Sequence, residues 1–378
     1  VVRTRESGQA AKRDLHSVPH APYECVAKGL RLATQESDFV QSCPNPDRHL
    51  DVQASIPPRL RPSKCRVTSL PVPGDVWTAA TSASENCRAV VYTTAIYDER
   101  ITDLRSRYWK DVSKQVCYVA FVGEWAMGTL PAESFGQWRP VTVRTRRTPS
   151  ESVNTRRISK LLKTMPHIFF PNVEYIMYLD LKLRLTMHPM TLILHALKDN
   201  RTHSAFFQHP CTASPSFTKG PCKRAAALMK VPVPKDGFSG AEWVRHEARL
   251  VSDVGRTGNA SHLTRTAMRH AVAVSTTDHR YADTAIVIYR VGVRSFDTAC
   301  RWHTQMVEDG IDRDQVSLFR VLHTHPDGIR LLPTTRPACG SFCTWWLTPD
   351  VASQVPRARP RANALPPHSR EKNGKRLR

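Results

Sequence analysis

Acidic residues are scarce in this sequence, and several patterns that would assign it to a common class are missing. It holds 33 Asp and Glu against 55 Lys and Arg, a formal net charge of +22. It has no run of 18 apolar residues, so no membrane-spanning helix is predicted, and any membrane anchor is expected outside this sequence. Zinc-finger spacing, an aromatic RNA-binding motif and a basic region joined to heptads are also missing, so only the charge favours nucleic-acid binding.

The excess of basic residues indicates polyanionic neighbours, such as nucleotide phosphates, an acidic polysaccharide or an anionic membrane surface. A general preference for arginine codons would explain the same excess without any binding function. The length of 378 residues allows two or three domains of usual size, or one large domain with extensions.

The ten cysteines are scattered and include no C-x-x-C pair. The closest two, Cys339 and Cys343, have no second pair at finger distance, which argues against a structural zinc site. An even number of scattered cysteines is typical of disulfides formed in an oxidising lumen, although buried free thiols fit the count as well. Two N-glycosylation sequons, at Asn200 and Asn259, are compatible with that compartment.

The most informative stretch runs from Arg156 to Lys182. It begins with a helical pattern that has an apolar face and a basic face. The apolar positions are Ile158, Leu161, Leu162 and Met165, and the basic positions are Arg156, Lys160 and Lys163. An apolar run of strand length, 173–179, follows and ends on Asp180. Basic stripes are also common on solvated helices, and an acid after a strand is often a turn residue or a cap.

Open α/β sheets bind ligands beyond the carboxyl ends of their strands. Asp180 is therefore a candidate for holding a metal ion, a ribose or a sugar hydroxyl. The basic face of the preceding helix would supply positive charge for a phosphate group.

Strand and helix patterns alternate between residues 87 and 330, which predicts an α/β domain with a mostly parallel sheet. We expect residues 1–86 to form an irregular N-terminal stem or extension, and residues 331–378 to form a basic tail rich in proline and arginine. Within the domain, 255–278 is interpreted as a polar, basic insertion. A late helix is expected to be capped by Ser295 and to stop at Gly310.

The order of the motifs resembles the glycosyltransferase-like domain of the plant TOD/MUCI family of Golgi hexosyltransferase-like proteins, which has bacterial relatives. The resemblance spans about two-thirds of the chain, from Val90 to Leu322. The matching motifs are VVYTTAIYD, YVAFV, SKLLKTMPHIFFP with YIMYLDLK, AFFQHP, AIVIYR, and a Trp302 helix that leads to RDQVS. No single motif is decisive, whereas K-x-x-P-H, strand-Asp-x-Lys and R-D-Q in this order are fairly specific.

This resemblance implies a GT-A-like nucleotide-sugar-binding fold. It also implies transfer of a hexosyl group from a nucleotide sugar to a hydroxyl of a glycan or glycoconjugate, in the Golgi or another secretory lumen. The implied catalytic residues are Asp180 and Asp314. The implied substrate-binding residues are Arg156, Lys160, Lys163, His167, Lys182, His209, Arg313 and Gln315. A diphosphate leaving group needs cationic or metal stabilisation, and a carboxylate such as Asp314 can orient or deprotonate an acceptor hydroxyl.

Mn²⁺ or Mg²⁺ is the expected cofactor, with Asp180 and, as a weaker candidate, His325 as ligands. Lys182 would repel such an ion and could neutralise phosphate itself. The family's glycines before Asp98 and its acidic residues after Cys211 are missing here. A catalytically impaired member that binds acidic polysaccharide or another polyanion is therefore the alternative. A ceramidase-like lipid amidase is a third hypothesis, for which the sequence offers no His-rich zinc site.

Overall fold

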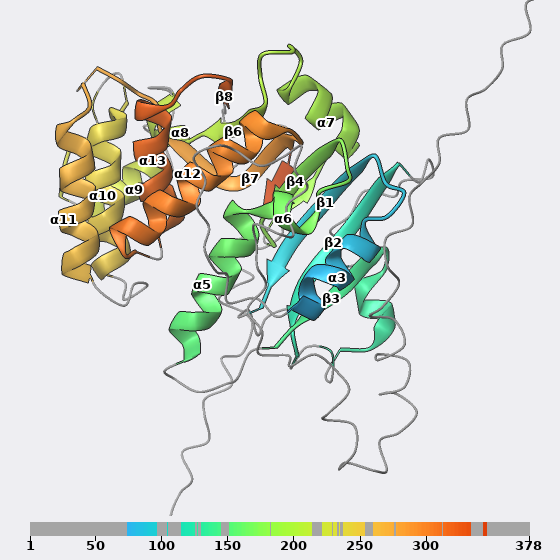
Figure 1. Ribbon diagram of the computed structural model, residues 1–378. Coiled ribbons are helices and arrows are strands. Elements are labelled where there is room, and N and C mark those ends of the chain that lie inside the picture. The colour runs from blue at the N-terminus through green and yellow to red at the C-terminus, as the bar shows by residue number, and fades with distance from the viewer. Residues whose placement is uncertain are drawn as a thin grey trace, which may run out of the picture. The chain divides into compact units, whose positions relative to one another are not determined.

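The computed structural model describes residues 74–96, 104, 115–124, 127, 130–144, 151–181, 183–213, 221–228, 230–232, 234, 237–253, 260–275, 277–311, 313–333 and 343–345. They fold around a seven-stranded sheet of order β3-β2-β1-β4-β7-β6-β8 (Figure 1). The strands are β1 (Ala89–Ala95), β2 (Val116–Gly123), β3 (Trp138–Val143), β4 (Tyr175–Leu179), β6 (Ser204–Gln208), β7 (Ala282–Arg290) and β8 (Ile329–Leu332). Strand β7 is antiparallel to β4 and β6, and the other neighbouring pairs are parallel. The α/β class with a mostly parallel sheet, predicted from the sequence, is confirmed.

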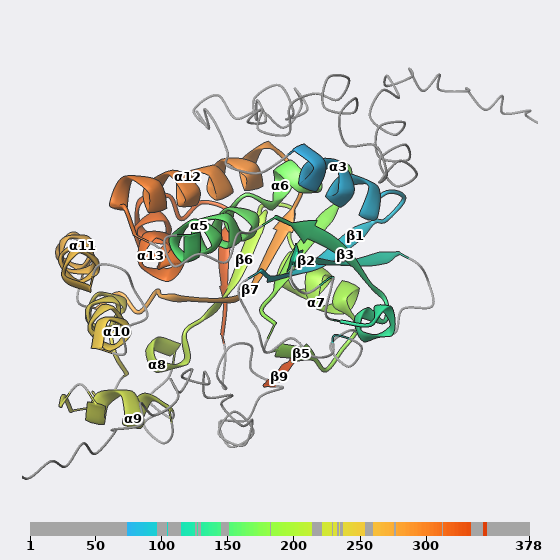
Figure 2. The same ribbon diagram turned by 90° about the horizontal axis from the view of Figure 1, so that it is seen from below.

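Helices cover both faces of the sheet (Figure 2). One face packs against α3 (Gly74–Ala83), α5 (Glu151–Thr164), α6 (Pro166–Phe169) and α12 (Val293–Asp309), and the other packs against α7 (Pro189–Ala196). Every residue of β1, β2 and β4 is buried. Parallel strands covered on both faces are typically continuous apolar runs, and this explains why these strands could be recognised in the sequence.

A separate helical layer lies beside the β6–β7 end of the sheet. It consists of α10 (Gly240–Asp253), α11 (Ala260–Val272) and α13 (Asp314–Thr324), with the short helices α8 (Pro210–Ala213) and α9 (Pro221–Leu228). The interpretation of 255–278 as a polar insertion is therefore wrong for α11. Its buried face is built from small and polar residues, and this weakens the apolar signal. The buried positions include Leu263, Thr266, Ala267, His270 and Ala271.

Three further expectations need correction. Residues 1–86 were predicted to be irregular, but 74–83 form α3, whose Val76 and Ala80 are buried in the core; residues 1–73 lie outside the described part. In the predicted tail, β9 (Cys343–Trp345) pairs with β5 (Leu183–Leu185). Ser295 is the third residue of α12 and Gly292 is the N-cap, but the Ser295 hydroxyl accepts a hydrogen bond from the Gly292 amide (3.2 Å) and so caps the first turn. Gly310 ends the helix in a left-handed conformation, as predicted.

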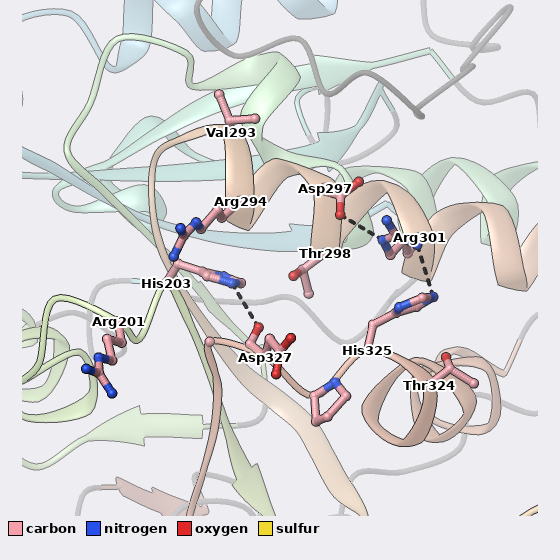
Figure 3. A pocket seen from close by; sticks show the side chains of 12 residues that line it. Arg201, His203, Val293, Arg294, Asp297, Thr298, Arg301, Thr324, His325 and Asp327 are labelled. Atoms are coloured by element: carbon pink, nitrogen blue, oxygen red, sulfur yellow. Dashed lines mark hydrogen bonds and ion pairs between the residues drawn. The ribbon is translucent and has the colours of Figure 1, made fainter.

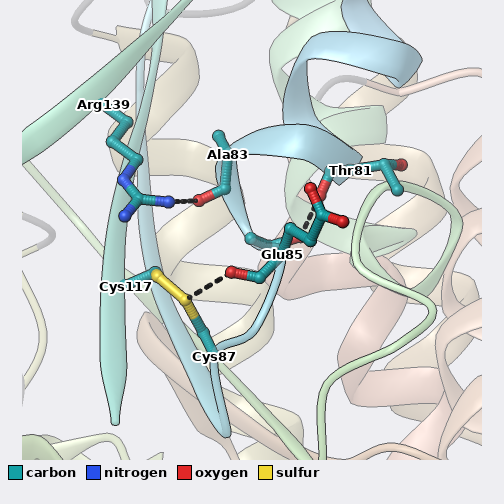
Figure 4. Close-up of a disulfide and its surroundings, with 7 residues drawn as sticks. Thr81, Ala83, Glu85, Cys87, Cys117 and Arg139 are labelled. Atoms are coloured by element: carbon teal, nitrogen blue, oxygen red, sulfur yellow. Dashed lines mark hydrogen bonds between the residues drawn. A yellow bond between two sulfur atoms is a disulfide. The ribbon is translucent and has the colours of Figure 1, made fainter. Parts of the chain in front are cut away.

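Two disulfides, Cys87–Cys117 and Cys211–Cys222, are present among the described residues, as the scattered cysteines predicted. The first joins the residues just before β1 to β2, its neighbour in the sheet (Figure 4). Next to it, Arg139 Nη1 of β3 donates a hydrogen bond to the Ala83 carbonyl at the end of α3 (2.6 Å). Within the described part of the chain, no helix is long and apolar enough to cross a membrane.

Candidate active site

The candidate site lies at the carboxyl end of β4, where the first residues of β7 and of α13 also lie. Asp180 follows β4, and its amide donates to the Ala285 carbonyl of β7 (2.8 Å). Because β7 is antiparallel to β4, its first residues, including Thr284, lie at this same edge. Helix α13 begins here with Asp314, whose carboxylate accepts a hydrogen bond from Thr284 Oγ1 (3.0 Å).

The centre of the site is a buried cluster of two lysines and one carboxylate, which we call the lysine–aspartate cluster. Lys160 Nζ lies 2.7 Å from Oδ1 of Asp314, and Lys163 Nζ lies 2.6 Å from Oδ2. Lys163 Nζ also donates to Thr284 Oγ1 (2.8 Å). The Asp314 side chain is 2% exposed and the Lys160 side chain is 18% exposed. The basic face of α5 therefore points into the protein at these positions and is not an ordinary solvated surface.

Two hydrogen bonds from side chains to backbone carbonyls hold the helices that carry the cluster in place. Lys160 and Lys163 are three residues apart on α5, so their side chains leave the same face of the helix. The Tyr92 hydroxyl donates to the Lys163 carbonyl (3.1 Å), and Trp302 Nε1 of α12 donates to the Asp314 carbonyl (2.8 Å). These two contacts fix α5 to β1 and the start of α13 to α12.

The lysines and the carboxylate of the cluster each favour the charged form of the other. Burial alone would raise the pKa of Asp314, but Lys160, Lys163 and Arg313 together hold it well below its usual range. Burial lowers the pKa of Lys163 to about 8, although the carboxylates of Asp314 and Asp180 oppose this effect. At neutral pH the carboxylate is therefore ionised and Lys163 is mainly protonated.

Arg313 extends the network toward α10. Its Nε and Nη2 both contact Glu247 Oε1, and the Tyr281 hydroxyl donates to Glu247 Oε2. His209 lies in the same region, with its ring 4.6 Å from that of Trp243. Burial would raise the pKa of Glu247, but Arg313 and His209 hold it below its usual value. The predicted residues His209, Arg313 and Asp314 thus lie in one connected region.

Asp180 also borders a narrow crevice that is too small to hold a water molecule. Thr93, near the end of β1, and Trp138 line the same crevice. Among the described residues, neither Thr93 Oγ1 nor Trp138 Nε1 has a hydrogen-bond partner, although both atoms are buried. Buried polar atoms are nearly always hydrogen-bonded, so these two are candidates for contacting a bound ligand.

The donor set at Asp180 suits a hard divalent cation in part. The Asp180 carboxylate and the Thr93 hydroxyl supply oxygen, which Mg²⁺ and Mn²⁺ prefer, and Mg²⁺ is commonly bound by one or two carboxylates together with substrate phosphates. Across the described ranges, no group of three or more His, Cys, Asp or Glu side chains is placed to hold a metal ion. Asp180 and Thr93 are the described residues that would hold such an ion.

Other predicted site residues lie apart from this edge. His167 is buried beneath α12, where its Nε2 contacts Ser295 Oγ (2.9 Å). His325 follows α13 at the opposite end of that helix and contacts Arg301 (3.0 Å). Gln315 is buried next to Asp314. Lys182 and the side chain of Arg156 lie outside the described part.

The sequence did not identify Thr284, Glu247, Thr93 or Trp138 as site residues. Thr93 and Thr284 are hydroxyl residues inside otherwise apolar strands, and Glu247 lies among buried apolar positions of α10. A polar residue on a buried face needs a partner, so these positions carried a usable signal. Trp138 carried none, because a tryptophan in a strand is ordinary.

Residues 73–217 match the family model described as TOD1/MUCI70, glycosyltransferase-like domain. The family resemblance predicted from the motifs is confirmed over this range, which holds Lys160, Lys163 and Asp180 but not Asp314. Mouse xyloside xylosyltransferase 1 in its apo form is a solved structure with 8% identity and a TM-score of 0.35, covering 65% of this chain and 84% of that chain. None of the curated proteins matches the chain.

Proposed function

We propose that this chain, which carries a TOD1/MUCI70 glycosyltransferase-like domain, transfers a hexosyl group from a nucleotide sugar to a hydroxyl of a glycan or glycoconjugate. The observation that carries the proposal is the family match over 73–217. Two disulfides support the Golgi or another secretory lumen as its compartment, because disulfides persist where the surroundings are oxidising.

Asp180 is assigned to donor binding. It stands at the carboxyl end of β4, where ligands of α/β sheets gather, and it borders the crevice that holds the unpartnered Thr93 hydroxyl. A divalent cation held by Asp180 and the diphosphate oxygens would add positive charge at the leaving group. The crevice at Thr93 and Trp138 is too small for a water molecule, so these two residues would contact the donor only after the crevice opens.

Lys160 is assigned to the diphosphate. Its side chain is more exposed than that of Lys163 and reaches the cluster from the solvent side. Negative charge grows on the nucleoside diphosphate as the glycosidic bond breaks, and a placed ammonium group stabilises it.

Asp314 would act in two stages. Both of its carboxylate oxygens contact lysines, so it positions Lys160 and Lys163. A bound diphosphate would compete with Oδ1 for the Lys160 ammonium. The released carboxylate oxygen could then accept a proton from the acceptor hydroxyl.

A thermal-shift screen of nucleotide sugars, with and without Mn²⁺, tests the donor half of this proposal. We expect one nucleotide sugar to raise the melting temperature, and Asp180→Asn to abolish the shift. Asp75→Asn, which changes an exposed acid on α3, is the matched control and should leave the shift unchanged. A screen in which no nucleotide sugar stabilises the wild type would count against the proposal.

A catalytically silent binder of acidic polysaccharide is the second candidate. One observation favours it: both lysines of the cluster are already paired with the buried Asp314 carboxylate, as they would be in a purely structural ion pair. Such a protein would bind polyanions with an affinity that falls steeply with salt and would ignore nucleotide sugars.

A further inference from the structure

A groove lies at the opposite edge of the sheet from Asp180, and we call it the edge groove. It has a volume of about 780 Å³ and lies between the first half of α12 and the turn that follows α13 (Figure 3). The charged and imidazole groups that line it include Arg201, His203, Arg294, Asp297, Arg301 and Asp327.

The strand register separates this groove from the candidate active site. Ser204, the first residue of β6, pairs with Tyr289 near the end of β7 and with Ile329 at the start of β8. Asp180 instead follows the last residue of β4. Helix α13 has 11 residues, so its two ends, Asp314 and Thr324, are roughly 15 Å apart at the helical rise per residue.

The groove is lined by two acids, Asp297 and Asp327, and Asp297 is already paired with Arg301. Arg301 Nε donates to Asp297 Oδ2 (2.7 Å), and its Nη1 contacts His325 Nε2 (3.0 Å), so this arginine is already engaged (Figure 3). Arg201 and Arg294 are exposed, and within the described part of the chain their guanidinium groups make no hydrogen bond or ion pair. Asp327 is the remaining acid at the groove.

His203 lines the groove and is held by two contacts. Its Nε2 lies 3.1 Å from the Asp327 carbonyl, which can only accept, so this nitrogen carries a proton, and Nδ1 lies 2.9 Å from Ser204 Oγ. Burial lowers the pKa of His203, and the hydrogen bond to the Asp327 carbonyl opposes this effect. Gly328 has a φ of +69°, and a Cβ there would overlap the His203 ring. A side chain at position 328 would therefore displace this histidine.

Two more arginines next to the groove donate hydrogen bonds to carbonyl groups. Arg290 Nη2 donates to the Leu197 carbonyl (2.6 Å), and Arg330 Nη1 donates to the His195 carbonyl (3.0 Å). Among the described residues, Arg290 Nε is buried without a hydrogen-bond partner, and Arg330 also interacts with the nearby Asp199 carboxylate. Five arginines, at positions 201, 290, 294, 301 and 330, thus outnumber the described acids Asp199, Asp297 and Asp327 at this edge.

We propose that the edge groove binds a phosphate or sulfate group carried by a sugar-sized molecule, with Arg201 and Arg294 contacting the oxyanion. Guanidinium groups match the geometry of such oxyanions and hold them with two parallel hydrogen bonds. The groove has the size of a small-molecule site. Its lining of carboxylates, Thr298 and Thr324 suits hydroxyl groups better than apolar surface. The proposal goes beyond the transferase function, because the site lies at the other edge of the sheet.

Calorimetric titrations of the full chain test this binding site. The probes are inorganic phosphate, inorganic sulfate, glucose 6-phosphate and glucose. We expect the sugar phosphate to bind more tightly than either inorganic anion and glucose to give no detectable heat. Replacing both Arg201 and Arg294 with glutamine should weaken binding by about tenfold or more, the scale of one or two charge-assisted hydrogen bonds. Both side chains are exposed and unpaired, so the melting temperature should not change.

Two further variants sharpen the test. Asp327→Asn removes the remaining acid and should tighten anion binding several-fold, the opposite sign from the arginine change. Arg265→Gln, an exposed arginine on α11, is the matched control and should have no effect.

The outcomes distinguish this proposal from the transferase function. Asp180→Asn should abolish nucleotide-sugar binding and leave glucose 6-phosphate binding intact. The proposal is overturned if none of the anions binds, if the double variant binds as tightly as the wild type, or if Asp180→Asn removes sugar-phosphate binding instead.

Discussion

Asp314 is the residue on which the most charges of the candidate site converge. Its carboxylate contacts Lys160, Lys163 and Thr284 while almost fully buried. Removing one partner of a buried ion pair leaves the other charges without compensation, which typically costs about 3–5 kcal/mol. We therefore predict that Asp314→Ala lowers the free energy of unfolding by about 3 kcal/mol or more, as measured by urea denaturation.

Lys160→Ala is the comparison for that change. Lys160 is partly exposed, and Lys163 would still balance the carboxylate, so we expect a loss of about 1 kcal/mol. Equal losses in the two variants would mean that Asp314 is not the centre of the cluster.

His167 is the residue whose protonation should make stability depend on pH. It is buried against Tyr289 and Phe296, and burial lowers its pKa to about 3 from an ordinary value of 6.5. The unfolded chain therefore binds a proton below pH 6.5 that the folded chain does not bind. Stability should fall as the pH drops from about 6.5 toward 3.

Urea unfolding of the wild type and of His167→Phe at pH 7 and pH 5 measures this contribution. Complete protonation of one unfolded histidine corresponds to about 1.4 kcal/mol per pH unit. The variant should lose less stability between the two pH values than the wild type. Some loss should remain in it, because burial also lowers the pKa of other histidines, among them His303. Identical losses in both proteins would show that His167 does not titrate as inferred.

At the scale of single elements, α11 offers the sharpest prediction. Leu263 is fully buried in its contact with the helical layer, whereas Met268 on the same helix is 39% exposed. Leu263→Ala should cost about 2–4 kcal/mol because it leaves a cavity, and Met268→Ala should cost less than about 1 kcal/mol. Thermal or urea unfolding of the two variants provides the comparison. A similar effect of both changes would contradict the packing of α11 against α10.

How far the sequence predicts an element depends on how that element is buried. Strands β1, β2, β4, β6 and β7 are apolar enough to be recognised, and they fixed the α/β class. Strand β8 was missed because its residues are mostly half-exposed at the sheet's edge, and α11 was missed because alanine, threonine and histidine fill its buried face.

The candidate site was predicted only in part for a similar reason. Lys160, Lys163 and Asp314 were named as site residues from motif resemblance, but their mutual contacts join positions more than 150 residues apart. Local periodicity carries no information about such pairs. The sequence already ranked His325 as the weaker metal candidate, and the structure places it just after the end of α13 that is opposite Asp314.

At the scale of the whole molecule, the two edges of the sheet have different chemistry. The carboxyl edge of β4 gathers Asp180, the lysine–aspartate cluster and the Arg313–Glu247 contact, and the opposite edge carries the edge groove. Helix α13 runs between them. Part of the net charge of +22 is thus placed where phosphate-bearing molecules would be expected, at both edges.

A transfer assay on the purified protein tests the central claim most directly. It measures nucleoside diphosphate release from the nucleotide sugar that stabilises the protein, in the presence of glycan acceptors. Release should depend on the acceptor and fall by about 10²-fold or more in Asp180→Asn. Acceptor-dependent release that persists in Asp180→Asn, or its absence from the wild type with every donor and acceptor, would contradict the account.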